Sequence, residues 1–283
     1  MANETTSSTL SELYTNVIQE AIFTFQETSV MRPLVTTYAI NGQGKTVQVP
    51  VYGAISASAV AEGTDLANTA VDPTAVDITA SEIGVMTTLT DLGRDSASRN
   101  VGADIGKLFG DGLAKKVDSD LAGLFASFST DVGSAGAELT PELLFKAQAT
   151  LRALNIPAPY YAVFNPKACF NLKKVLTAGG YSLLSAHAIS DVGNQALKDG
   201  FVGRVAGIDV FENANIAIDG NDDSVGAVFH PASIGLAMKS DLKIETQRDA
   251  SIRGTEIVAS MTVGQGIVKN DYGVKMTVDS LLN

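Results

Sequence analysis

Apolar residues recur every three or four positions near the start of the chain. This spacing predicts an amphipathic helix over residues 9–27 with a wide apolar face. Such a helix requires a second surface that covers its apolar face, so we expect residues 1–40 to form an N-terminal arm that docks on other structure. The apolar positions are Leu10, Leu13, Tyr14, Val17, Ile18, Ala21, Ile22 and Phe25.

Alternation of apolar and polar residues, which is typical of strands, follows this arm. It extends over Thr46–Tyr52, where Pro50 indicates an edge strand or its irregular end, and it resumes over residues 76–80. A phase change near Ser81 then predicts a bulge. Together these segments favour an extended two-stranded loop over residues 41–92. Because an isolated hairpin is only marginally stable in water, the loop implies a neighbouring surface that supports it.

A long helix is predicted next. Between Ser96 and Phe128 the apolar residues are spaced by three, four and occasionally five positions. This spacing predicts one helix of roughly 30 residues and about 45 Å, longer than a small compact domain is wide. Glycine recurs within it at every fourth position, at Gly102, Gly106 and Gly110. Since each glycine costs on the order of 1 kcal/mol relative to alanine, the three favour a close approach by another backbone segment.

The rest of the chain mixes helices and strands. Thr140 and Pro141 predict the start of a helix that ends at about Leu154. Asn165 predicts the cap of a second helix, directly after a buried strand at Tyr160–Phe164. Strand patterns dominate the final third, so the whole chain is predicted to have an α+β fold. The expected strands cover residues 205–211, 227–229, 242–246, 257–263 and 272–278.

Composition and charge narrow the functional classes. The chain has 283 residues, of which 45% are apolar, enough for one large domain with a lobe or for two smaller domains. With 20 basic and 31 acidic residues, its formal net charge of −11 disfavours tight binding to nucleic-acid phosphates. A single cysteine and a start without a signal-peptide pattern fit synthesis in a reducing cytoplasm. No run of about 18 apolar residues predicts a membrane span.

No group of residues indicates a catalytic or metal site, so we expect neither enzymatic activity nor a cofactor. His187 and His230 lack a second metal ligand at suitable spacing, and Cys169 lies in an apolar helical run where a buried thiol is commoner than a nucleophile. Gly264-Gln265-Gly266 lacks the third glycine of a dinucleotide-binding motif. The acidic turn from Asp219 to Ser224 resembles the start of a calcium loop but lacks its glycine and final glutamate, which favours a solvated loop over a calcium site.

Four segments resemble, in the same order, motifs of the major capsid proteins of tailed bacteriophages. Ala59–Gly63 is similar to a Val/Ala-x-Glu-Gly segment of their extended loop, and Tyr161–Lys167 is similar to a strand that ends in Asn-Pro. Val205–Val210 resembles a strand motif in which Asp209 replaces the common proline. Ile244–Asp249 resembles a Val-Glu-x-x-Arg-Asp motif that precedes the closing strands. The resemblance covers nearly the whole chain.

This resemblance implies a Hong Kong 97-like capsid fold. Its parts would be an N-terminal arm (1–40), an extended β-hairpin loop (41–92), a peripheral domain with a long spine helix and closing strands (93–135 and 240–283), and an axial domain (136–239). It also implies assembly as pentamers and hexamers into an icosahedral shell that encloses a phage genome in the virion. Assembly would take place in the cytoplasm of the host bacterium, with a portal protein and decoration proteins as further partners.

The resemblance also implies where subunits meet, because the extended loop of this family lies over a neighbouring subunit. The inter-subunit contacts predicted on this basis are Pro50, Val51, Tyr52, Ala61, Glu62, Gly63, Ile83 and Val85. The acidic turn is expected near a capsomer axis or at an exposed rim. Its polar residues are Asp219, Asn221, Asp222 and Asp223.

Two alternatives remain open. An encapsulin, the shell protein of a bacterial nanocompartment, has the same fold and is distinguished by a neighbouring cargo gene in place of portal, terminase and tail genes. A soluble β-rich binding protein or hydrolase would need a polar site that we do not find, and it would purify as a monomer or small oligomer.

The chain departs from the founding member of the family at its start. Only a few polar residues precede the first predicted helix, where the founding member has a long scaffolding region. We therefore expect a separate scaffolding protein. Uniform full-size shells formed by this chain alone would contradict that expectation.

A second departure generates a prediction about covalent cross-links. Residues 53–90 contain no lysine, whereas the founding member joins an extended-loop lysine to an asparagine of another subunit. We predict that mature particles of this protein lack such links and run as monomers on a denaturing gel. A ladder of covalent oligomers would contradict the prediction.

Overall fold

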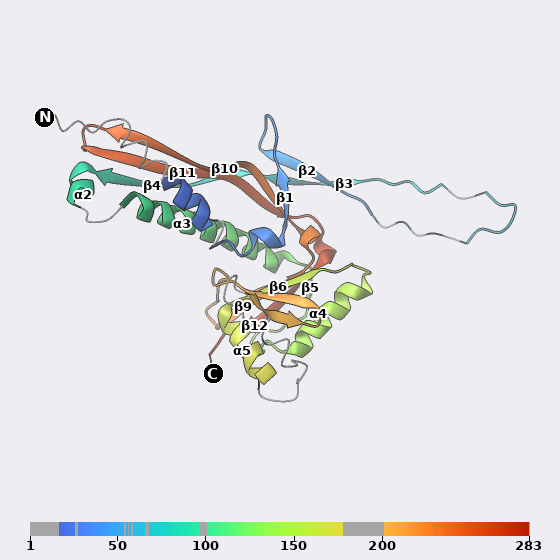
Figure 1. Cartoon of the computed structure of the whole chain (residues 1–283). Helices are drawn as coiled ribbons and strands as arrows, with labels where there is room; N and C mark the ends of the chain where they lie inside the picture. The colour runs from blue at the N-terminus through green and yellow to red at the C-terminus, as the bar shows by residue number, and fades with distance from the viewer. Residues whose placement is uncertain are drawn as a thin grey trace.

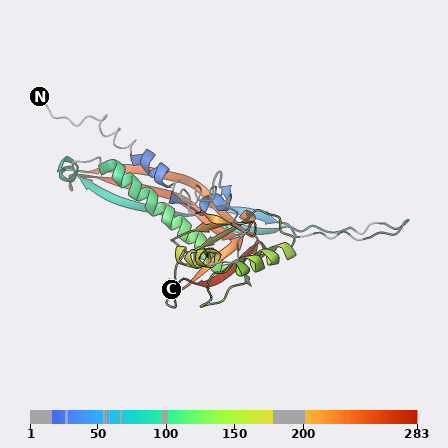
Figure 2. The same ribbon diagram turned by 60° about the horizontal axis from the view of Figure 1, so that its bottom comes forward.

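The computed structural model is an elongated molecule with a compact second part beneath it (Figure 1). The structure describes residues 17–25, 28–53, 55, 57, 59–65, 68–96, 101–177 and 201–282. A long sheet and a projecting loop lie nearly in one line, as Figure 2 shows from another side. The predicted α+β class is confirmed.

A four-stranded sheet forms the elongated part. Its elements are η1 (Arg32–Leu34), β1 (Thr36–Ala39), β4 (Ser81–Thr90), α2 (Asp91–Ser96), α3 (Val101–Gly123), η2 (Leu124–Ser127), β10 (Ile234–Asp249) and β11 (Gly254–Ile267). The strand order is β1-β10-β11-β4, with β1 parallel to β10 and the other pairs antiparallel. Helix α3 runs along one face of this sheet (Figure 1). The sheet and α3 together form a long, thin body.

In the described residues, a six-stranded sheet with two helices forms the second part. Its elements are β5 (Thr130–Asp131), α4 (Pro141–Ala153), β6 (Tyr160–Phe164), α5 (Pro166–Thr177), β7 (Phe201–Val205), β8 (Ile208–Glu212), β9 (Asp223–Phe229), η3 (Pro231–Ser233), η4 (Asn270–Tyr272) and β12 (Gly273–Asp279). The strand order is β5-β12-β9-β6-β8-β7. A separate two-stranded ladder pairs β2 (Thr46–Val51) with β3 (Thr74–Thr79).

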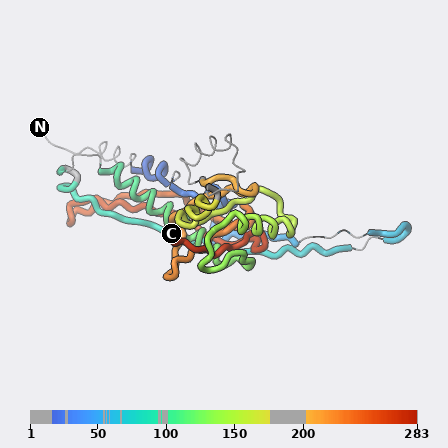
Figure 3. Tube along the Cα trace, turned by 90° about the horizontal axis from the view of Figure 1, so that it is seen from below, coloured from blue at the N-terminus to red at the C-terminus, as the bar shows by residue number. Residues whose placement is uncertain are grey.

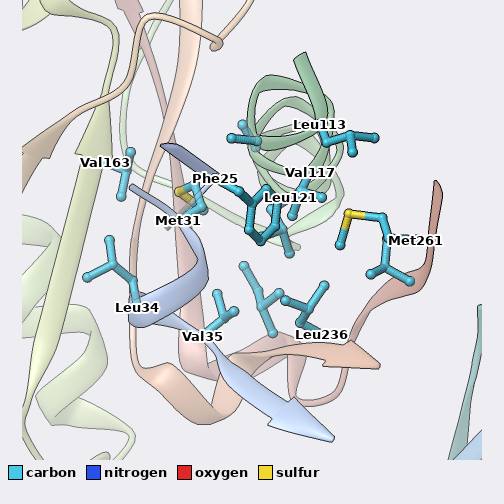
Figure 4. Close-up of a cluster of buried hydrophobic side chains, with 14 of the residues drawn as sticks. Phe25, Met31, Leu34, Val35, Leu113, Val117, Leu121, Val163, Leu236 and Met261 are labelled. Carbon is cyan, nitrogen blue, oxygen red and sulfur yellow. The ribbon is translucent and has the colours of Figure 1, made fainter. Parts of the chain in front are cut away.

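The first core lies where helical residues 17–25, α3 and the long sheet meet. Phe25 packs with Val117 and Leu121 of α3, and Leu236 and Met261 of the sheet close the cluster (Figure 4). All five side chains are at most 2% exposed. Because full burial of a large apolar side chain contributes about 1.5–3 kcal/mol, this cluster holds the N-terminal segment firmly against α3.

Strand β9 joins the first core to a second one in the six-stranded part. Successive residues of a strand point to opposite faces of the sheet. Phe229 lies in the first core, where its ring centroid is 5.6 Å from that of Phe125, whereas Val228 lies in the second core. The two parts of the molecule are therefore packed into one continuous body.

Glycines of α3 allow helical residues 17–25 to cross it at close range. A Cβ atom on Gly106 would lie 2.6 Å from the carbonyl oxygen of Val17, and one on Gly110 would lie 2.4 Å from that of Ala21. Residues four apart share one face of a helix, so both contacts fall on the same side of α3. The close approach predicted from the glycine spacing is confirmed at these two positions.

The predicted helices differ from the structure mainly in length. The helix predicted from Ser96 to Phe128 is present as α3, preceded by the separate short helix α2 and followed by the 3-10 turn η2. The predicted N-terminal helix is present over residues 17–25. Its earlier part, and His187, lie outside the described residues.

The bulge predicted near Ser81 is instead a change of partner strand. Strand β3 pairs with β2, and after Ala80 the chain continues as β4, which pairs with β11 in the long sheet. Ile83 packs against the first core, so the apolar face of β4 is drawn under α3. The extended two-stranded loop expected from the sequence is therefore shorter in the structure, where its ladder ends at Thr79. Ile83 and Val85 lie outside it, on β4.

Two further strand assignments differ from expectation. The strand predicted over residues 205–211 is a hairpin, since Ala206 (φ 56°) and Gly207 (φ 74°) form the tight turn between β7 and β8. Strand β12 lies in the six-stranded sheet rather than with the long helix, because its buried residues, such as Met276, belong to the second core. The domain boundaries predicted from the resemblance stay predictions.

We predict opposite effects for two glycine substitutions in α3. Gly110→Ala should lower the free energy of unfolding by about 1–3 kcal/mol, since its Cβ would overlap the backbone of Ala21. Gly112→Ala, exposed on the same helix and with nothing within 4 Å of the new Cβ, should raise it by up to about 1 kcal/mol. Urea unfolding measures both. Equal effects would contradict the close crossing.

Candidate assembly surfaces

The projecting loop, residues 52–73, is the most exposed segment of the described chain. It leaves the ends of β2 and β3 and extends away from the body (Figure 1, at the right). Every described residue in it is exposed, and a turn closes near its middle, where the N–H of Thr64 donates to the carbonyl oxygen of Ala61 (3.2 Å). Loops of this length without a ladder of their own are uncommon in compact domains, and ordered ones usually bind something.

The loop combines apolar side chains with one sign of charge. Four large apolar side chains in it are between 42% and 60% exposed, namely Tyr52, Ile55, Val60 and Val71. Its charged residues are all acidic, namely Glu62, Asp65 and Asp72. These exposed apolar side chains make the projecting loop a candidate contact surface.

The base of the projecting loop is fixed on the long sheet. A third apolar cluster holds it there, formed by Ile40, Val49, Ile78, Ala80, Ala237 and Val268. A Cβ atom on Gly264 would lie 2.3 Å from the carbonyl oxygen of Thr79, so this glycine allows the end of β3 to lie directly on β11. The Gly264-Gln265-Gly266 segment therefore has a packing role. The third apolar cluster and the β2–β3 ladder together set the direction in which the loop projects.

The predicted contact residues fall in three places. Pro50 and Val51 pair with Ala75 and Thr74 at the end of the ladder, at the base of the projecting loop. Tyr52 begins the loop, and Ala61, Glu62 and Gly63 form the turn near its middle. Ile83 and Val85 lie apart from all of these, on β4. The contacts themselves stay a prediction.

The acidic turn is built by hydrogen bonds within the chain. Two backbone N–H groups of the turn donate to Oδ1 of Asp219 (2.8 and 2.9 Å), and Asp222 adopts a positive φ of 61°. Asp223 is buried and accepts a hydrogen bond from the N–H of Gly136 (2.7 Å). Asp219, Asn221 and Asp222 are exposed. Its position at a capsomer axis or rim stays a prediction.

Asp118 of α3 is a buried carboxylate that joins three segments of the chain. It accepts hydrogen bonds from Oγ of Ser29 (2.8 Å) and from the N–H groups of Val30 (2.9 Å) and Met31 (3.2 Å). The side-chain amide of Asn213, beyond β8, donates a fourth (3.4 Å). Burial raises the pKa of Asp118 above its ordinary value, and the four hydrogen bonds act in the opposite direction. A single aspartate in a helix of mixed charge gave no sequence signal for this role.

Arg248 fixes the far end of the long sheet. Its guanidinium donates two hydrogen bonds to the carboxylate of Asp91 (2.7 and 2.6 Å), and the N–H of Asp91 donates to the carbonyl oxygen of Arg253 (2.9 Å). A two-point contact of this kind fixes orientation as well as distance. The arginine of the motif at Ile244–Asp249 therefore serves a contact within the chain, which ties the start of α2 to the hairpin between β10 and β11.

Cys169 and His230, the described candidates for a catalytic or metal-binding role, have surroundings that favour a structural role. Cys169 is fully buried, and burial, with the charge of Glu212 adding to it, raises the pKa of its thiol to about 12. His230 begins η3, where its Nδ1 accepts a hydrogen bond from the N–H of Ala232 (3.1 Å). Burial lowers its pKa, and the charge of Lys269 adds to this effect. Within the described residues, no group of three or more His, Cys, Asp or Glu side chains could hold a metal ion.

No helix in the described part of the chain has both the length and the apolar character needed to cross a membrane.

Comparison with solved structures identifies the fold. The capsid of cyanophage P-SCSP1u superposes with a TM-score of 0.71 at 19% sequence identity, over 89% of this chain and 88% of that one. The chain has the fold of phage capsid proteins. The head structure of Helicobacter pylori bacteriophage KHP40 gives 0.68 at 11% identity, over 89% and 92% of the two chains. The predicted Hong Kong 97-like fold is confirmed.

The same capsid fold occurs in a virus-like particle from Pyrococcus furiosus. That structure superposes with a TM-score of 0.65 at 14% identity and covers 94% of this chain and 99% of that chain. No protein-family model matches the chain, and no curated protein matches it at the level of sequence. The likeness to capsid proteins therefore lies in the arrangement of the elements, which the capsid fold conserves while its sequence varies.

We predict that Cys169 is unreactive in the folded chain. With a pKa of about 12, roughly one thiol in 10⁴ is ionised at pH 8, and the thiolate is the reactive form. Ellman's reagent should therefore modify the folded chain at least about a thousandfold more slowly than the urea-unfolded chain. Equal rates would contradict the burial of this thiol.

Proposed function

We propose that this chain is the structural subunit of an icosahedral phage head and has no catalytic role. It assembles as pentamers and hexamers into the shell that encloses the genome in the virion. The observation that carries this proposal is the projecting loop, whose described residues are all exposed and include four large apolar side chains. A segment with this composition gains its stability from a second copy of the chain.

The long, thin body also supports a role in a shell. The sheet with α3 offers a broad surface for repeated contacts, and many modest contacts add up to a stable closed assembly. The second part of the molecule would face the capsomer axis, with the acidic turn near that axis or its rim. Among the reported neighbours, phage heads favour the phage assignment over an encapsulin.

The further partners follow from this assignment. A phage shell requires a portal protein at one vertex, and we propose a separate scaffolding protein and decoration proteins in addition. The net charge of −11 suits an inner wall that leaves packaged DNA mobile, because like charges repel. Assembly would take place in the cytoplasm of the host bacterium.

Electron microscopy of the chain, expressed with and without the scaffolding protein of its gene neighbourhood, tests the proposal. Polyhedral shells or capsomer rings are the expected result. A stable, monodisperse monomer in every assembly condition would overturn it. Shells that contain a protein cargo instead of DNA in their natural host would assign the chain to a nanocompartment.

We predict that the projecting loop is required for assembly and dispensable for folding. Replacement of residues 52–73 by Asn-Gly joins β2 to β3 through a two-residue turn that suits their antiparallel pairing. Since no described residue of the loop is buried, the midpoint of urea unfolding should change little. Shells should be absent in electron micrographs of this variant.

Substitutions within the full-length loop separate its apolar contacts from its length. Serine at the four exposed apolar positions Tyr52, Ile55, Val60 and Val71 should abolish shells. The matched control carries serine at the polar positions Thr64, Asn68 and Thr69, and it should assemble as the unmodified chain does. Normal shells from the apolar-to-serine variant would show that the loop does not work through its apolar side chains.

A further inference from the structure

The six-stranded part of the molecule has two opposite sides, called flanks below, whose exposed side chains are complementary in charge. Helix α4 lies on one side, and the end of the described chain, beyond β12, lies on the other (Figures 1 and 3). The acidic turn belongs to the second side, because the N–H of Ser280 donates to the carbonyl oxygen of Asp222 (2.7 Å). One molecule therefore cannot bring these two flanks together.

The flank at α4 is apolar and basic. Phe145 is 40% exposed and Leu154, at the C-terminal end of α4, is 52% exposed. Lys146 and Arg152 are also exposed, and neither forms an ion pair with any described residue. The one acidic residue of the helix, Glu142, is in its first turn. The exposed surface of α4 thus carries two large apolar groups beside two positive charges.

The opposite flank is apolar and acidic. Leu281 is 42% exposed and Leu282 is 58% exposed, directly after Ser280. Asp219 and Asp222 lie in the turn that Ser280 contacts, are exposed, and have no basic partner among the residues that the structure describes. This surface thus carries two large apolar groups beside two negative charges, which is the complement of the α4 flank.

We propose that the α4 flank of one copy docks on the flank of Asp219, Asp222, Leu281 and Leu282 of a second copy. Because the two surfaces differ, the contact repeats from head to tail and closes into a ring when the rotation between copies fits. Exposed leucine and phenylalanine side chains supply the dry centre of the contact. The opposite charges at its rim fix the register and speed the encounter.

This inference rests on the proposed shell function and adds the surfaces through which neighbours within one capsomer meet. It differs from the contact of the projecting loop in its dependence on charge. Since rim ion pairs are screened by salt, the contact between flanks should weaken as the salt concentration rises. The apolar contact of the projecting loop should respond less.

A single charge reversal tests the proposal. Arg152→Glu should raise the chain concentration needed for half-assembly by about tenfold or more, since a like-charge rim replaces an attractive one. The matched control is Lys243→Glu, which makes the same charge change at an exposed position of β10 in the long sheet and should shift that concentration by less than about twofold. Light scattering against chain concentration measures both, and urea unfolding verifies that both variants fold. Equal shifts in the two variants would overturn the proposal.

Chemical cross-linking of the unmodified chain provides a test without any variant. A carbodiimide joins a lysine to a carboxylate in direct contact, so assembled particles should yield a Lys146 to Asp219 or Asp222 link. Assembly from a mixture of ¹⁵N-labelled and unlabelled chains identifies the link as one between copies by its mixed mass. Assembled particles in which Lys146 links only to other carboxylates would overturn the docking of these flanks. Failure of the unmodified chain to assemble would overturn the proposed function as well.

Discussion

The structure depends on one physical constraint, which is that no described part of its own chain covers the projecting loop. Its four large apolar side chains are exposed, and in the described residues its backbone forms no ladder beyond β2 and β3. The remainder of the molecule fixes where this loop goes. The third apolar cluster and Gly264 hold its base on β11, so the loop is presented in one direction instead of sampling many. A loop presented in this way loses less conformational entropy when a neighbour binds it.

Packing and hydrogen bonds make the rest of the molecule a rigid support for the projecting loop. Helical residues 17–25 cross α3 at Gly106 and Gly110, and Asp118 ties the following segment to α3 and to Asn213. Strand β9 contributes alternate side chains to two cores, which joins the elongated part to the six-stranded part. The loop at one end and the flanks of the six-stranded part are thus carried by one continuous packed unit, as an ordered shell requires.

Sequence patterns predicted the helices well, because apolar spacing and capping residues act over a few neighbouring positions. The spacing of apolar residues and glycines in α3 indicated both the long helix and its close neighbour, and the cap at Asn165 indicated the start of α5. Sheet membership was less accessible, because β12 is placed by burial against distant residues and the turn at Ala206 has an alanine where glycine or asparagine is the usual signal. Asp118 and the two complementary flanks gave no sequence signal, since each depends on contacts between segments far apart in the chain. The turn at Ala61–Gly63, by contrast, lies in the loop to which its motif had assigned it.

Hydrogen exchange of the projecting loop, compared between unassembled chains and purified shells, tests the central claim most directly. In unassembled chains the backbone amides of residues 52–73 should exchange as fast as those of an unfolded peptide, since the described residues of the loop form few hydrogen bonds within the chain. In shells the same amides should be protected at least about a hundredfold, because a neighbouring copy covers them. Equally fast exchange in both states would contradict the account of this loop as the segment that holds subunits together.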